Sequence, residues 1–146
     1  MKKLWILRRI RNLGGSMEDL LTVYKLQLRC LTEMCCPAWN GSLTQENIRV
    51  LERLQKTTLW IILGHEYTDY TSALKKFDLD TLENRRSKLS LSFARKTASN
   101  SKYEAWFPKT SVSTRAGKPY TKPYARTSIY QKSPLFYLMD LLNSQD

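Results

Sequence analysis

The apolar residues of this chain recur at intervals of three or four positions, the spacing that places side chains on one face of an α-helix. The first such series consists of Leu4, Leu7, Ile10 and Leu13. It predicts a helix over residues 3–13 that ends at Gly14-Gly15. No comparable alternation of apolar and polar residues indicates strands, so we predict an all-α fold.

The next segment has both a start signal and a broad apolar face. Ser16 is placed to cap a helix that runs to about Met34, with Glu18 and Asp19 in its first turn, where acids favour the helix dipole. Its main stripe is Leu20, Tyr24, Leu28 and Leu31. Val23, Leu26 and Cys30 widen the stripe, and a helix that is apolar on most sides is usually central in its fold.

Two further helices and a short one complete the predicted domain. Thr44 caps a helix over 45–63 that Gly64 terminates, and its predicted inner face is Ile48, Leu51, Leu54, Leu59 and Ile62. A loop at 65–71 and a short helix at 72–77 follow. The D-x-x-E pair of Asp80 and Glu83 then opens a helix to about Ser99, with Leu82, Leu89 and Phe93 on its apolar face. We therefore predict a bundle of four to five helices over residues 1–100.

The composition changes over residues 101–146. Serine, threonine, tyrosine and lysine dominate, Pro108, Pro119 and Pro123 interrupt the chain, and the apolar periodicity is lost. This composition predicts an extended basic tail that is largely disordered. Within the tail, only residues 134–142 have a sequence compatible with a short helix.

The stretch "CCPAWNGSL" (35–43) contains reactive-looking groups, but no chemistry assembles around them. The three cysteines Cys30, Cys35 and Cys36 cannot pair evenly, which favours free thiols in a reducing, intracellular compartment, cytoplasm or nucleus. Zinc-type ligand spacings are absent, and the single histidine, His65, is remote. We expect no metal and no cofactor.

Secretion and membrane insertion are also disfavoured. The apolar run in "MKKLWILRR" has only four residues, too few for a signal peptide, and the run Leu59–Leu63 is too short to span a bilayer. The Asn40-Gly41-Ser42 triplet is therefore not expected to be glycosylated, because an acceptor needs the secretory pathway.

The strongest functional signal is charge. The 146 residues carry 24 basic and 13 acidic side chains, a formal net charge of +11. Such a balance favours an anionic partner, most often RNA or DNA and less often acidic lipid or protein. The basic residues form three clusters on predicted helices: Arg8, Arg9 and Arg11; Arg49, Arg53 and Lys56; Arg85, Arg86, Lys88, Arg95 and Lys96.

Aromatic residues accompany these cations. Trp60 continues the helical spacing of the second cluster, where an indole could stack on a base beside bound phosphates. The alternative is a solvated helix face with Trp60 at a domain contact. In the tail, aromatic residues alternate with cations such as Lys118 and Arg115, a pattern that suits single-stranded nucleic acid.

Catalytic signatures are missing. The chain has no glycine-rich phosphate loop, no G-x-S-x-G elbow and no H-E-x-x-H. The "YTDY" at 67–70 has one carboxylate where a polymerase needs two adjacent ones to hold its metal ions. We expect no enzymatic activity and no small-molecule substrate.

Four segments in unbroken order resemble the region that follows the polymerase core in reverse transcriptases of non-LTR (LINE-type) retrotransposons. They are "KKLWILRRIRNLG", "DLLTVYKLQLRCLTEMCCPAWNGSLT", "LERLQKTTLWIILG" and "YTSALKKFDLDTLENRRSKLSLSFARK". The resemblance covers about residues 3–100, and its most specific pieces are Leu31–Trp39, Leu51–Gly64 and Leu82–Lys96. This sequence departs from the family at Met34-Cys35, where an aromatic-alanine pair is usual, and at Trp60, where an arginine is usual.

The resemblance implies a helical, thumb-like extension and a nucleic-acid context. It does not imply polymerase activity, because the fingers, the palm with its paired aspartates and the endonuclease have no counterpart in this sequence. Two functions remain open: a non-catalytic fragment that binds RNA or DNA through basic helix faces, and a protein-interaction module or inert remnant that packed on the missing polymerase core.

Overall fold

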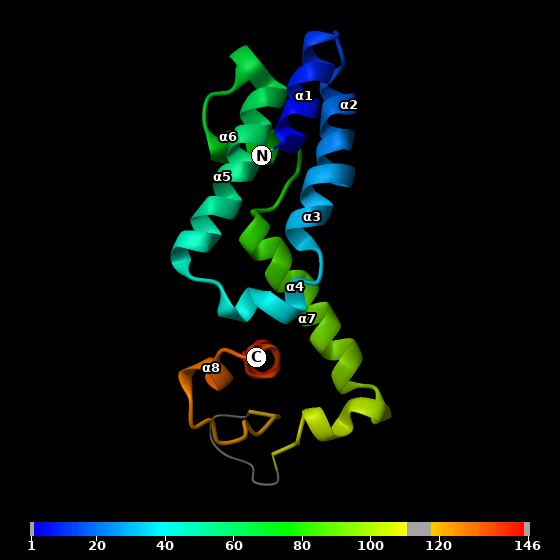
Figure 1. The fold of residues 1–146 in the computed structure, drawn as a ribbon. Helices are drawn as coiled ribbons and strands as arrows, with labels where there is room; N and C mark the ends of the chain where they lie inside the picture. The colour runs from blue at the N-terminus through cyan, green and yellow to red at the C-terminus, as the bar shows by residue number, and fades with distance from the viewer. Residues whose placement is uncertain (1, 111–117, 145–146) are drawn as a thin grey trace. The chain divides into compact units, whose positions relative to one another are not determined.

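The computed structural model describes residues 2–110 and 118–144, which fold almost entirely into helices (Figure 1). In chain order the elements are α1 (Lys2–Asn12), α2 (Met17–Val23), η1 (Tyr24–Arg29), α3 (Cys30–Glu33), α4 (Cys36–Trp39), η2 (Asn40–Ser42), α5 (Gln45–Leu63), η3 (Gly64–Glu66), α6 (Tyr70–Lys76), α7 (Leu82–Ala98), η4 (Ser101–Trp106), α8 (Ser128–Gln131) and α9 (Pro134–Asn143). Those ranges contain one isolated antiparallel bridge, between Lys109 and Tyr120, and no strand. The predicted all-α fold is confirmed.

The chain divides into two compact units. The first comprises residues up to Met34 together with Thr44–Arg85, and the second comprises Cys35–Leu43 and the chain from Arg86 onward. In the first unit, α1 lies beside both α2 and α5 (Figure 1). The buried apolar residues of this unit are Leu4, Leu7, Leu20, Tyr24, Leu28, Leu59, Ile61, Ile62, Leu63, Ala73 and Leu74. The predicted apolar stripes of α1, α2 and α5 supply most of this core.

Local capping sets most helix ends where the sequence predicted them. The Ser16 hydroxyl accepts a hydrogen bond from the Asp19 backbone N–H, and the Asp19 carboxylate accepts in return from the Ser16 backbone N–H, which completes a capping box. Thr44 caps α5 through the Asn47 N–H. Gly64 ends α5 with a φ of 58°, a conformation that glycine adopts without strain.

The start of α7 differs from the prediction. Thr81, not Asp80, is the capping side chain, since its hydroxyl accepts from the Asn84 N–H at 3.2 Å. The backbone carbonyl of Asp80 instead accepts from the buried amide of Gln55. The helix therefore begins at Leu82, one residue later than the D-x-x-E pattern suggested.

The second predicted helix contains a π-helical turn, which changes the face it buries. Residues Tyr24–Arg29 form this wide turn between α2 and α3. A π turn holds more residues than an α turn, so the position buried after Leu28 is Thr32 and not Leu31. Leu31 is 47% exposed and Leu26 is 64% exposed, and the prediction of both in the buried stripe is wrong.

Helix α7 also buries a face other than the predicted one. In the second unit, Arg86, Ser90 and Ala94 are buried, whereas Leu89 and Phe93 are exposed. The small side chain of Ser90 allows the Cys36 sulfur of α4 to approach its hydroxyl within 3.9 Å. Close packing of α4 on α7 therefore turns the larger apolar residues of α7 outward.

The prediction of an extended, disordered tail is not confirmed for the described residues beyond 100. Phe107 and the α9 residues Leu138 and Met139 form a buried cluster with Ala94 of α7. The amide of Asn143 donates to the backbone carbonyl of Tyr120 and accepts from its N–H, each at 3.0 Å. The short helix predicted at 134–142 is confirmed as α9. Arg115, one of the cations predicted to alternate with aromatic residues, lies outside the described residues.

Candidate nucleic-acid interface

The side-by-side contact of α1 and α5 brings two predicted basic clusters together in the first unit. The Arg11 guanidinium donates a hydrogen bond of 2.7 Å to the backbone carbonyl of Ile61. Arg11 is only partly exposed, and this hydrogen bond joins α1 to α5. Arg11, which the sequence predicted to bind phosphate, therefore also has a structural role.

The outer face of α5 carries the second predicted cluster. Arg49, Arg53, Lys56 and Trp60 are all exposed and follow one another at spacings of four, three and four residues. At a rise of about 1.5 Å per residue, this row extends roughly 16 Å along the helix. Arg49 forms an ion pair with Glu46, but both side chains are largely exposed, and such pairs contribute about 0–1 kcal/mol and are easily exchanged.

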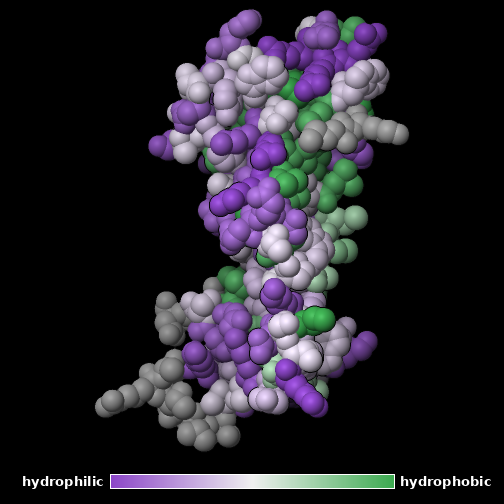
Figure 2. All heavy atoms as spheres, turned by 60° about the vertical axis from the view of Figure 1, so that its left-hand side comes forward, coloured by the Kyte–Doolittle hydropathy of each residue, from purple (hydrophilic) through white to green (hydrophobic). Residues whose placement is uncertain are grey.

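A shallow pocket of about 370 Å³ lies where α1 meets the end of this row. Its lining consists of Arg8, Arg11, Asn12, Trp60 and Ile61. Arg8, Arg9 and Asn12 are exposed on α1, and Trp60 is 53% exposed. Figure 2 brings the α5 and α6 side of Figure 1 forward and shows hydrophilic side chains spread over that side of the first unit, with an apolar band beside them. An exposed indole among cations is the combination that binds bases and phosphates.

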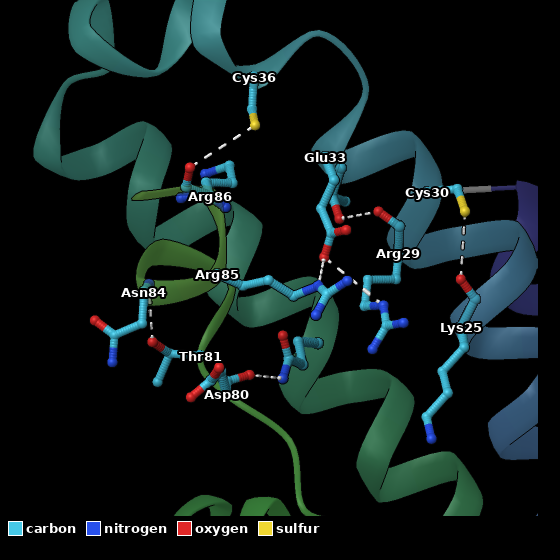
Figure 3. Close-up of polar contacts among 12 residues, drawn as sticks. Lys25, Arg29, Cys30, Glu33, Cys36, Asp80, Thr81, Asn84, Arg85 and Arg86 are labelled. Carbon is cyan, nitrogen blue, oxygen red and sulfur yellow. Dashed lines mark hydrogen bonds and ion pairs between the residues drawn. The ribbon is translucent and has the colours of Figure 1, made fainter. Parts of the chain in front are cut away.

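The third predicted cluster is divided by the structure. Arg85, in the first unit, points toward Glu33, and its Nε donates to that carboxylate at 2.5 Å (Figure 3). The same carboxylate pairs with Arg29 at 3.7 Å. Because the Glu33 side chain is only 12% exposed and its carboxylate is shared by the two guanidinium groups, the Arg85 side chain forms a structural ion pair.

Arg86 is fully buried in the second unit, which overturns its assignment to an exposed phosphate-binding face. Its Nε donates to the side-chain oxygen of Asn40 at 2.9 Å, and its guanidinium lies 5.8 Å from the Trp39 ring centroid. Within the described part of the chain, its two terminal nitrogens have no hydrogen-bond partner. The cause is the buried face of α7, which includes position 86 along with 90 and 94.

The remaining predicted site residues of α7 are Lys88, Arg95 and Lys96, all exposed in the second unit. The structure therefore brings Arg8 and Arg11 of α1 beside Trp60 in the first unit, at the end of the exposed α5 row of Arg49, Arg53 and Lys56. The Lys56 ammonium lies over the Tyr70 ring of α6, 5.4 Å from its centroid. The structure does not bring Arg85 or Arg86 into that group.

The sequence analysis did not identify two asparagines that contact the predicted basic residues or line their pocket. Asn12 lies one helical turn after Arg8 and lines the same pocket, a position that i, i+4 spacing alone could have flagged. Asn40, by contrast, meets its partners across 46 and 97 residues, and no local pattern points to it.

Tyrosines carry the unusual electrostatics of the first unit. The Tyr70 hydroxyl donates to Glu52 at 2.5 Å, and burial together with this carboxylate raises the pKa of Tyr70 far above 10.0. The other Glu52 oxygen accepts from the Glu83 backbone N–H at the start of α7. Burial likewise raises the pKa of Tyr24. These groups are neutral at physiological pH and serve the fold.

Other kinds of site find no support in the described ranges. Cys30, Cys35 and Cys36 form no disulfide within the described residues. Over residues 2–110 and 118–144, no group of three His, Cys, Asp or Glu side chains is arranged to hold a metal ion. Within the same part of the chain, no helix combines the length and the apolarity needed to cross a membrane.

Comparisons with known proteins return no relative. No protein-family model matches this chain, and no curated protein or solved structure matches it significantly.

Proposed function

We propose that this chain binds RNA or DNA as a non-catalytic module, through the surface formed by α1 and α5. The observation that carries the proposal is the pocket in which Arg8 of α1 meets the half-exposed indole of Trp60, at the end of the exposed α5 row of Arg49, Arg53 and Lys56. Basic side chains at intervals of roughly 5–6 Å along a helix suit successive phosphates, and their binding releases counterions.

The same proposal covers the origin of the chain. The ordered resemblance of residues 3–100 to the segment after the polymerase core of non-LTR reverse transcriptases supports descent from such an enzyme. In this proposal the chain is a fragment that has kept a nucleic-acid surface and has no polymerase activity of its own. Its partners are RNA or DNA and, as a second partner, a reverse-transcriptase core, inside the cell.

The test is the salt dependence of binding to fluorescein-labelled RNA and DNA oligonucleotides, followed by anisotropy. Affinity should fall steeply between 50 and 200 mM salt, because each phosphate contact contributes about 0.7–0.9 to the logarithmic slope. Lys56→Ala should reduce that slope by about one contact. Lys75→Ala is the matched control, since Lys75 is also exposed but lies on α6.

Two results would overturn the proposal. One is the absence of binding at 50 mM salt, and the other is binding that does not change with salt. Equal effects of the Lys56 and Lys75 substitutions would show that net charge matters and the α1–α5 surface does not.

A second candidate function rests on exposed apolar residues. Leu26, Leu31 and Met34 are 64%, 47% and 63% exposed on η1, α3 and the residue that follows. Such a surface favours a protein-interaction module, or a remnant that once packed on a polymerase core. Light scattering tests this alternative, because a protein that stays a monodisperse monomer at high concentration would contradict it.

A further inference from the structure

We propose that the pocket lined by Arg8, Asn12 and Trp60 receives a single unpaired nucleobase, so that the chain prefers single-stranded over duplex nucleic acid. This inference rests on the proposed function and specifies the form of nucleic acid that the α1–α5 surface takes. It assigns a different role to each side chain of the pocket.

Trp60 supplies the stacking platform. Its large, mostly apolar side chain is 53% exposed. It lies at the end of the row of cations on α5. Base–aromatic stacking tolerates any sequence because every base has a π-face. An exposed indole in a basic row is therefore suited to a base whose neighbours along the strand are bound through phosphates.

The floor of the pocket is held in place before any ligand arrives. Arg11 is tied to the Ile61 carbonyl at 2.7 Å, and Ile61 itself is buried. The pocket measures about 370 Å³, near the lower end of the sizes of small-molecule sites. A shallow depression of this size has room for one flat ring system, whereas the paired bases of a double helix cannot enter it.

The α1 side of the pocket offers polar groups at complementary positions. Arg8 and Asn12 are four residues apart, so they lie on one face of α1 about 6 Å along its axis. A guanidinium pairs with phosphate in a bidentate manner, whereas a carboxamide donates to and accepts from a base edge. Arg8 is thus assigned to a phosphate and Asn12 to the edge of the stacked base.

Only an unpaired base meets these conditions. In a duplex both faces of each base are covered by its neighbours, and taking one base out of the stack costs a few kcal/mol. A single strand offers its bases without this cost. Lys56 and Arg53, roughly 6 and 10 Å along α5 from Trp60, then contact the phosphates of adjacent nucleotides.

The experiment compares a labelled 12-nucleotide single strand with the duplex of the same sequence at fixed low salt. Trp60→Ala should weaken single-strand binding roughly 5- to 100-fold and change duplex binding less than about twofold. Trp60→Phe should restore most of the affinity because it keeps an aromatic face. Trp106→Ala is the matched control: Trp106 is also 53% exposed but belongs to the second unit, and its loss should change neither affinity.

A second variant guards against a folding defect. Asn12 is exposed, and Asn12→Ala should weaken single-strand binding several-fold while the circular dichroism spectrum and melting temperature stay unchanged. Equal affinity for single strand and duplex, or equal losses from Trp60→Ala and Trp106→Ala, would overturn this inference. Salt-dependent binding would in that case still support the proposed function, whereas no binding to either oligonucleotide would overturn both.

Discussion

The Nε–H of Arg86 donates to the side-chain oxygen of Asn40 over 2.9 Å, a contact between residues 46 positions apart in the second unit. The amide of Asn40 also donates to the Tyr137 hydroxyl of α9 at 2.6 Å. Asn40 therefore connects a buried cation on α7 with the helix that ends the described chain. Arg86 has its guanidinium desolvated, and the Trp39 ring supplies part of the compensation.

Asn40→Ala should destabilise the protein by about 1–3 kcal/mol or more, since it removes the hydrogen bond to a buried charged group and leaves Tyr137 without its partner. Urea unfolding followed by circular dichroism measures the change. Asn47→Ala, at an exposed position on α5, should stay within about 0.5 kcal/mol. Equal stabilities of the two variants would show that the Asn40 contacts contribute nothing.

Two of the glutamates that pair with arginines, Glu33 and Glu46, should differ in their effect on stability. Glu33→Gln removes a carboxylate that is 12% exposed and shared by Arg29 and Arg85, and we expect a loss of about 1–3 kcal/mol. Glu46→Gln removes a carboxylate that is 66% exposed, and we expect less than about 0.5 kcal/mol. Thermal unfolding of both variants measures the two losses of stability. A larger loss for Glu46→Gln than for Glu33→Gln would contradict the prediction.

Two glycines with positive φ should respond differently to alanine. At Gly64, with φ of 58°, an added Cβ would collide with the Arg11 guanidinium, which must then leave the Ile61 carbonyl. At Gly14, with φ of 85°, nothing lies within 4 Å of the added atom. Gly14→Ala should thus cost about 1 kcal/mol of backbone strain alone, and Gly64→Ala about 1–2 kcal/mol more.

The origin of the extra cost at Gly64 can be checked by a double-mutant cycle. In an Arg11→Ala background, Gly64→Ala should cost about 1 kcal/mol less than in the unaltered protein, because the guanidinium is no longer there to be displaced. The remaining cost is the strain of alanine at φ 58° and ψ −115°. Fully additive effects of the Gly64 and Arg11 substitutions would count against this explanation.

Tyr70 predicts a loss of stability in alkali. In the unfolded chain its hydroxyl loses its proton near pH 10.0, whereas in the folded protein burial and Glu52 raise the pKa of Tyr70 well beyond that value. Above pH 10 the folded form thus binds more protons than the unfolded form, and stability falls as the pH rises. Below pH 10 the contribution is constant.

Urea unfolding between pH 8 and pH 11 measures this effect. Tyr70→Phe has no ionisable hydroxyl, so its stability should decline less steeply above pH 10 than that of the unaltered protein. Parallel curves for the two proteins would show that the pKa of Tyr70 is not raised by folding.

The candidate site was predictable in part. The exposed row of Arg49, Arg53 and Lys56 follows from helical spacing within one element, and the structure confirms that these residues share a face. The pocket beside Trp60 did not follow, because it needs residues of α1 and α5 that are about 50 positions apart. Helical periodicity within one segment carries no information on which neighbour lies against it.

Sequence alone determined the helix boundaries that depend on hydrogen bonds within three or four residues, such as the Ser16 and Thr44 caps and the stop at Gly64. Only the tertiary structure decided which of two neighbouring arginines is fully buried. Arg85 meets Glu33 and Arg86 meets Asn40, partners that are 52 and 46 residues away. It likewise ordered the described part of the tail, because α9 gains its stability by packing on α7 and not from its own short length.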